Sequence, residues 1–178
     1  GPMGIGVLWG RRELLDALPP YQSGSNAAHA VDFDSAEWSP GGLRFGAGTP
    51  NVAGAIGMAA AIRFLTDIGF PALQQHEAEL TAALVEELGR VPRLSIVGPP
   101  DSRERICLCS FTLGAMDPDQ VMGQLDQEGI AIRSGDLAAL PLLRRFGVTR
   151  AARASLYLYN TRAEVARLGE GLRRMVRS

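Results

Sequence analysis

The order of helix and strand signals from about residue 70 onward limits the fold more than any other feature of the sequence. Pro71 opens an amphipathic helix. Signals for a strand, a strand, a helix, a strand, a helical turn, a strand and a helix follow. A small sheet with helices packed on one face satisfies this order. We therefore predict an α/β chain whose C-terminal part is a small α+β domain.

The boundaries of these elements follow from caps and periodicity. Strands are expected at 94–97, 105–113, 130–133 and 152–158. Asp117 followed by Pro118 predicts a helix start, and Gly129 its end. A helical turn is expected at 142–146. Thr161 and Glu164 form a capping-box pattern that begins the last helix. The leucines of the first helix and the apolar residues of the last one predict the core: Leu73, Leu80, Leu84, Leu88, Val165, Leu168, Leu172 and Val176.

The first 65 residues are not a complete unit in this sense. They predict a buried strand at 5–9, a short helix at 11–18, a long loop at 21–48 and a helix at 52–68 with Thr49 as its N-cap. We expect 1–65 to be the end of a larger domain and 66–178 to be the small domain. The abrupt apolar start indicates that further sequence precedes it.

Composition excludes several classes of function. The chain has 178 residues and a net charge of −1, which gives no electrostatic case for nucleic acid. It lacks a signal-peptide pattern and an uninterrupted apolar run of about eighteen residues, so we expect a cytoplasmic protein that does not enter a membrane. All 18 basic residues are arginine, so this chain supplies no Schiff-base lysine. Cys107 and Cys109 share one face of a predicted strand and are expected to be buried, and no metal-ligand spacing is present.

Five stretches match one family in order and spacing. They are GPMGIG at 1–6, RFGAGTPN at 44–51, IRSG at 132–135, RASLYLYNT at 153–161, and the helix from Glu164. The chain resembles the C-terminal part of Suf-type cysteine desulfurases, which are class V aminotransferase-fold enzymes. The resemblance implies pyridoxal phosphate (PLP) fold type I, an obligate homodimer and a small amino-acid substrate. The cofactor lysine would lie in the N-terminal half, upstream of residue 1.

The resemblance also implies roles for four residues. Arg153 would bind the substrate α-carboxylate, since a guanidinium offers a planar two-point fork; a structural ion pair is the alternative. Arg133 would lie near the mouth of the active site, or would be a surface charge. Thr49 and Gly48 would approach the PLP phosphate of the partner subunit, and a cap role for Thr49 is compatible with this. No catalytic residue is assigned to this chain.

One departure from the family decides the chemistry. The persulfide-forming cysteine aligns with Ala138, and alanine cannot be a nucleophile. A PLP site that keeps the carboxylate clamp but lacks the thiol points to a carbon–sulfur lyase acting on cysteine or an S-substituted cysteine. Epimerase and β-decarboxylating relatives share the scaffold. The alternative from another class is a non-catalytic dimerisation or docking module, which the missing lysine and cysteine favour.

Overall fold

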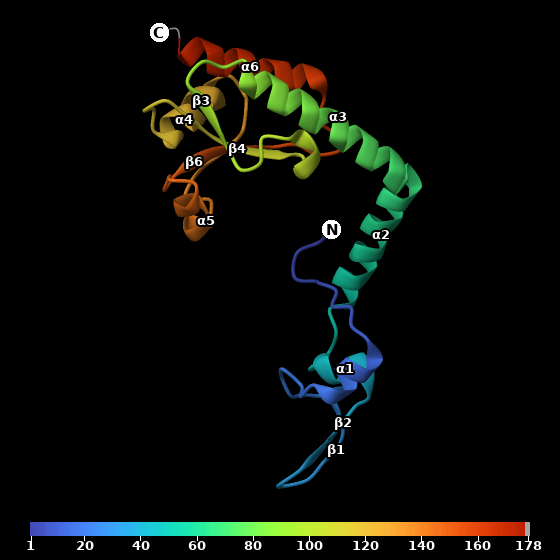
Figure 1. Cartoon of the computed structure of the whole chain (residues 1–178). Helices are drawn as coiled ribbons and strands as arrows, with labels where there is room; N and C mark the ends of the chain where they lie inside the picture. The colour runs from blue at the N-terminus through green and yellow to red at the C-terminus, as the bar shows by residue number, and fades with distance from the viewer. Residues whose placement is uncertain (177–178) are drawn as a thin grey trace. The chain divides into compact units, whose positions relative to one another are not determined.

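The computed structural model describes residues 1–176 and divides the chain into two compact units. The first unit is Gly1–Ile68, and the second begins at Gly69. Figure 1 shows the elements of both units in chain order. The second unit contains most of the buried side chains, and each unit is described by itself below.

The second unit is built on a four-stranded sheet in the order β3-β4-β6-β5. The strands are β3 (Leu94–Val97), β4 (Leu108–Leu113), β5 (Arg133–Gly135) and β6 (Ala151–Ser155). All three neighbouring pairs are antiparallel. The sequence predicted each of these strands, although three of them begin or end several residues from the expected positions.

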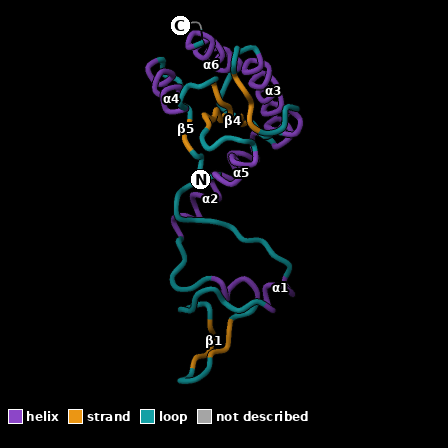
Figure 2. The backbone as a smooth tube through the Cα atoms, turned by 60° about the vertical axis from the view of Figure 1, so that its left-hand side comes forward, coloured by secondary structure: helices purple, strands orange, loops and turns teal. Residues whose placement is uncertain are grey.

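Helices cover one face of this sheet, as predicted. They are α3 (Phe70–Gly89), α4 (Pro118–Gln127) and α6 (Arg162–Met175), and a short helix α5 (Leu140–Arg145) precedes β6. Figure 2 shows α3, α4 and α6 gathered around the strands of this unit. The capping box at the start of α6 and the aspartate cap of α4 are both present, so these two predictions are confirmed.

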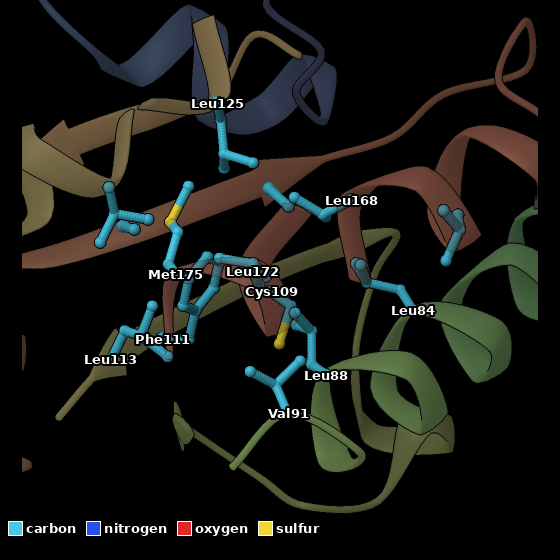
Figure 3. Close-up of a cluster of buried hydrophobic side chains, with 14 of the residues drawn as sticks. Leu84, Leu88, Val91, Cys109, Phe111, Leu113, Leu125, Leu168, Leu172 and Met175 are labelled. Carbon is cyan, nitrogen blue, oxygen red and sulfur yellow. The ribbon is translucent and has the colours of Figure 1, made fainter. Parts of the chain in front are cut away.

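The core lies between these helices and the sheet. Phe111 and Cys109 of β4 are fully buried against Leu84, Leu88 and Leu172 from the helices (Figure 3). Burial along β4 alternates residue by residue, because successive side chains of a strand point to opposite faces. Seven of the eight predicted core residues are buried: Leu73, Leu80, Leu84, Leu88, Val165, Leu168 and Leu172. Val176 is partly buried and packs against the core.

Strand β5 starts three residues later than expected, and the end of α4 explains the shift. Gly129 has a left-handed backbone, and its N–H donates to the carbonyl of Asp126. The N–H of Ile130 donates to the carbonyl of Leu125. This pair of bonds is a Schellman motif, which satisfies the last carbonyls of the helix. Ile130 is therefore part of the helix end rather than of the strand.

The first unit holds little regular structure. It contains α1 (Arg12–Ala17), a hairpin of β1 (Ala28–Val31) and β2 (Ala36–Trp38), a 3-10 helix (Gly41–Phe45) and α2 (Val52–Ile68). The bounds of α2 agree with the prediction, and α1 lies within its expected range. The hairpin and the 3-10 helix lie inside the segment that the sequence predicted to be a loop.

Two predictions for this unit are wrong. Residues 5–9 form no strand, and Val7, Leu8 and Trp9 are 80%, 77% and 83% exposed. A strand needs a hydrogen-bonding neighbour, and the described residues offer none here. The cap of α2 is Asn51 rather than Thr49, because the Asn51 side-chain oxygen accepts from the Gly54 N–H at 2.8 Å.

Among the described residues, no single helix is both long and apolar enough to cross a membrane. The consecutive helices α2 and α3 meet that criterion of length and composition only when taken together.

Candidate functional site

The candidate site is a row of residues on the sheet face that the helices leave uncovered. Register pairs Val97 with Ser110, Ser110 with Arg153, and Arg153 with Arg133. The row therefore crosses all four strands. Its neighbours in sequence, such as Phe111 and Ala152, point into the core. Because side chains alternate along a strand, the row must lie on the opposite face, which we call the second face.

Arg153 is half-buried at the centre of this row. Its Nε is fully buried and has no hydrogen-bond acceptor within residues 1–176. Nor do the described residues provide any carboxylate within ion-pair distance of its guanidinium. A buried, unpaired donor costs about 1–3 kcal/mol, so native structures seldom leave one without a reason. The Nε of Arg153 is thus an unused donor that an anion would satisfy.

Arg133 lies directly opposite Arg153 on the edge strand β5. Opposed residues of an antiparallel pair have Cβ atoms about 4.5–5.5 Å apart, and like charges there are destabilising. The Arg133 side chain is exposed and makes no ion pair within the part of the chain that the structure describes. The second face thus brings together two of the four predicted site residues. An anion between them would relieve the repulsion.

The loop after β5 is held in an unusual conformation. Leu137 and Ala138 both have left-handed backbones, with φ of 56° and 53°. The Asp136 side chain accepts a hydrogen bond from the Ala138 N–H at 3.0 Å, and its carbonyl accepts from the Ala139 N–H at 2.9 Å. Left-handed non-glycine residues are uncommon and cluster at functional sites. The loop that carries Ala138 is therefore shaped by Asp136 rather than left extended.

A polar cluster lies on the helix side of the same two strands. Asp119, in the first turn of α4, accepts from the Ser134 hydroxyl at 2.6 Å and from the Arg150 guanidinium at 2.5 Å. Asp117 lies 3.7 Å from the same guanidinium. The Ser134 hydroxyl and the Arg150 charge hold the pKa of Asp119 below its ordinary value. Sequence analysis missed this cluster. Its only signal was the acidic pair at a helix start.

The other two predicted site residues, Gly48 and Thr49, lie in the first unit. Gly48 has a left-handed backbone with φ of 84°, and open space surrounds the position of a Cβ there. Its N–H donates to Ser25 and its carbonyl accepts from the Asn26 side chain. The exposed hydroxyl of Thr49 makes no hydrogen bond within residues 1–176, and it directly precedes Pro50 at the start of the α2 segment.

The two cysteines do not join the site. Cys107 and Cys109 are free and buried, and both belong to the core. Burial raises the pKa of each thiol, which lowers the population of the nucleophilic thiolate. The prediction that they are buried hydrophobic residues is confirmed.

A hollow of about 210 Å³ lies near the end of β6, and neither Arg133 nor Arg153 lines it. It is lined by Ile130, Leu156, Asn160 and Arg167, among others. These residues come from the end of α4, the segment after β6, and α6. The hollow is therefore separate from the arginine row of the second face.

Comparison with known proteins identifies the family. The sequence pattern described as aminotransferase class-V matches residues 1–168. The chain therefore belongs to the aminotransferase class-V family, as its motifs predicted. A probable cysteine desulfurase of Streptomyces coelicolor is 46% identical over 172 residues, which are 97% of this chain and 41% of that protein. The chain thus spans about two-fifths of the length of the curated relatives that it matches.

Solved structures agree with this assignment. A cysteine desulfurase from Thermococcus onnurineus, in its apo form, aligns with a TM-score of 0.93 and 33% identity, covering 99% of this chain and 44% of that one. A cystine C–S lyase in complex with cysteine persulfide aligns with a TM-score of 0.72 and 18% identity, covering 92% of this chain and 40% of that one. The second likeness shows the fold alone. The fold predicted from sequence is confirmed.

Proposed function

We propose that this chain is the substrate-binding C-terminal portion of a PLP-dependent, cysteine desulfurase-like enzyme. In that enzyme it serves a carbon–sulfur lyase reaction on cysteine or an S-substituted cysteine. The observation that carries the proposal is the unpaired, buried guanidinium nitrogen of Arg153 opposite a second arginine, Arg133. Such a pair suits the carboxylate of a small amino-acid substrate.

Two arginines have different parts in this reading. Arg153 is half-buried, so water competes less for its guanidinium, and it would bind the α-carboxylate. Arg133 is exposed on the edge strand and would attract the substrate and strengthen the same contact. Both groups would bind and orient the substrate carboxylate.

The residues of the first unit fit a phosphate. A free hydroxyl on Thr49 and a backbone that can approach closely at Gly48 are the groups that would hold the PLP phosphate, in the partner subunit of a homodimer. When bound, PLP supplies an electron sink at the substrate Cα, which permits loss of the α-proton and of a sulfur leaving group from Cβ. Its lysine would come from the N-terminal half of the same enzyme, since this chain has none.

The surface of the first unit supports a partner. Within residues 1–65 we propose the end of the large PLP-binding domain, with 66–178 as the small domain. The described residues of the first unit bury only Ala27, Ser39, Gly41 and Gly54. Large apolar side chains are instead exposed, among them Trp9 at 83% and Phe33 at 102%. Large apolar side chains left exposed in this number support an interaction surface, here for the rest of the enzyme and its second copy.

The choice of lyase over desulfurase depends on Ala138. A desulfurase transfers the substrate sulfur to an enzyme thiol and releases alanine, whereas a lyase releases pyruvate after carbon–sulfur cleavage. We expect the chain joined to its lysine-bearing half to form pyruvate from L-cysteine or L-cystine. The variant Ala138→Cys should gain alanine as a product. Alanine and sulfide from the unmodified enzyme would contradict the lyase assignment.

The substrate role of Arg153 is tested in the same joined enzyme. The lysine-bound cofactor should give a visible absorbance band, and Arg153→Ala should raise KM by about 10- to 100-fold, the loss expected for a charge-assisted pair. Arg162→Ala, which removes an exposed arginine of α6, is the matched control and should leave KM unchanged. No absorbance band, or equal KM values for the two variants, would refute the proposal.

The competing reading is a non-catalytic dimerisation or docking module. The absence of lysine from the sequence and the alanine at 138 favour it. It predicts that Arg153→Ala leaves biological activity intact. The second face argues against it, because a docking module has no use for an unpaired buried guanidinium.

A further inference from the structure

Asp119 connects the two strands that carry the arginine pair. One carboxylate oxygen accepts from Ser134, the middle residue of β5, at 2.6 Å. The other accepts from Arg150, the residue directly before β6, at 2.5 Å. The carboxylate itself is fixed in the first turn of α4, where the Asp119 N–H donates to Asp117 at 2.8 Å. One side chain thus holds both strands to the same helix end.

Because of the strand register, the hydrogen bonds of Asp119 to the two strands also constrain the positions of Arg133 and Arg153. Ser134 pairs with Ala152. Arg133, which precedes Ser134, pairs with Arg153, which follows Ala152. Since side chains alternate along a strand, a tether on Ser134 toward the helix sends Arg133 to the second face. A tether on Arg150 likewise fixes the start of β6. Asp119 therefore sets the relative position of two guanidinium groups that it does not touch.

Strand β5 needs such a tether for two reasons. It is an edge strand of only three residues, so the backbone ladder gives it few hydrogen bonds. It also places Arg133 opposite the like charge of Arg153, which pushes the strands apart. The hydrogen bonds of Asp119 to Ser134 and Arg150 lie on the other side of the sheet, so they hold the two strands together against this repulsion without occupying Arg133 or Arg153. Exposed ion pairs contribute little to stability, so the Asp119–Arg150 pair matters for the position of the strands rather than for the free energy of unfolding.

We propose that Asp119 is a positioning residue for substrate binding. Through Ser134 and Arg150 it keeps the guanidinium groups of Arg133 and Arg153 at the separation that a carboxylate requires. The inference rests on the proposed function, because it needs Arg153 to bind the substrate. Misplacement of a binding group by a fraction of an ångström is costly, since two-point contacts depend on geometry.

The test uses the full enzyme, with the lysine-bearing half joined and PLP bound. The measurement is the apparent Kd for L-alanine, an amino acid without a leaving group, from the change in the cofactor absorbance. Asp119→Asn should weaken binding about three- to tenfold, and Ser134→Ala about two- to threefold. The matched control is Asp101→Asn, which removes another exposed aspartate–arginine pair, with Arg103, away from these strands.

A cycle with Arg153→Ala separates positioning from general damage. In that background Asp119→Asn should have a much smaller effect, because only the guanidinium of Arg133 remains to be positioned. If Asp119→Asn behaves like Asp101→Asn, or weakens binding equally in both backgrounds, the inference is overturned. If Arg153→Ala itself leaves the Kd unchanged, the proposed function has failed. Ser134→Ala, which keeps every charge, covers the case in which the aspartate variant misfolds.

Discussion

Replacing Arg153 by methionine is expected to stabilise the chain while it weakens carboxylate binding. The Arg153 side chain lies in the row of strand residues on the second face, and its Nε is buried without an acceptor. An unsatisfied buried donor costs about 1–3 kcal/mol. The methionine side chain reaches about as far as the Nε of arginine, so it fills the buried part of the site and has no donor there. The terminal nitrogens of the arginine are not among the fully buried atoms, so the gain should fall in the lower part of that range, about 1 kcal/mol.

The assay is urea denaturation of the 178-residue chain without cofactor or substrate, followed by far-UV circular dichroism. The expected rise of about 1 kcal/mol corresponds to about 2–4 °C in Tm for a chain of this size. Arg105→Met is the matched control. Arg105 donates to the carbonyls of Val97 and Pro99, so its loss should lower stability by about 1–3 kcal/mol. The two arginine variants therefore differ in sign.

The result that would refute this reasoning is a loss of 1 kcal/mol or more for Arg153→Met, about the effect expected of Arg105→Met. Such a loss would mean that the Arg153 guanidinium has a stabilising partner within the chain. It would then be a structural ion or hydrogen-bond donor, and the substrate-binding proposal would lose its main observation. Stabilisation together with weaker carboxylate binding is the signature of a residue retained for function.

Three further results are expected. Gly171→Ala should destabilise the chain by about 1 kcal/mol in thermal unfolding, because the new Cβ would lie 2.8 Å from buried Leu125. Gly123→Ala is the control: its new Cβ would lie in open space, so it should stabilise the chain by about 0.5–1 kcal/mol. The capping box lowers the pKa of Glu164, so its contribution to stability is present above its unfolded pKa of about 4.3 and is lost as the pH falls through the lower folded value. Urea titrations should therefore show Glu164→Gln to be less stable than the unmodified chain at pH 7 and equal to it near pH 2. Thr49→Val in the proposed homodimeric enzyme should release PLP faster on dilution, measured from the cofactor absorbance, and an unchanged rate would contradict the phosphate role of Thr49.

Local signals predicted the helices of the second unit well. The Thr161–Glu164 pair and the Asp117 cap act within one helical turn, so sequence neighbours contain all the necessary information. The leucine spacing of α3 predicted its buried face for the same reason. The prediction of Thr49 as a cap was wrong because Asn51, two residues later, competes for the same role and forms the bond to the Gly54 N–H.

Features that depend on pairing between distant segments were not predictable from local sequence. The apolar run at 5–9 has strand composition but no neighbouring strand among the described residues. The pairing of Arg133 with Arg153 is a matter of register across 20 residues of chain. The link from Asp119 to Arg150 spans 31 residues. The motif resemblance indicated which arginines to consider, and the sheet shows that two of them are opposed.

The core of the second unit also determines which strand residues form the arginine row of the second face. Phe111 is fully buried on one side of β4, while its neighbour Ser110 belongs to the row on the other side. A slip of one residue between β4 and β6 would place Phe111 and Arg153 on the same face of the sheet, so that either the ring is exposed or Arg153 is turned into the core. Exposing the ring alone costs about 1.5–3 kcal/mol, and burying an unpaired charge costs more. Substitutions in the core should therefore impair carboxylate binding through register, even though no core side chain reaches the second face.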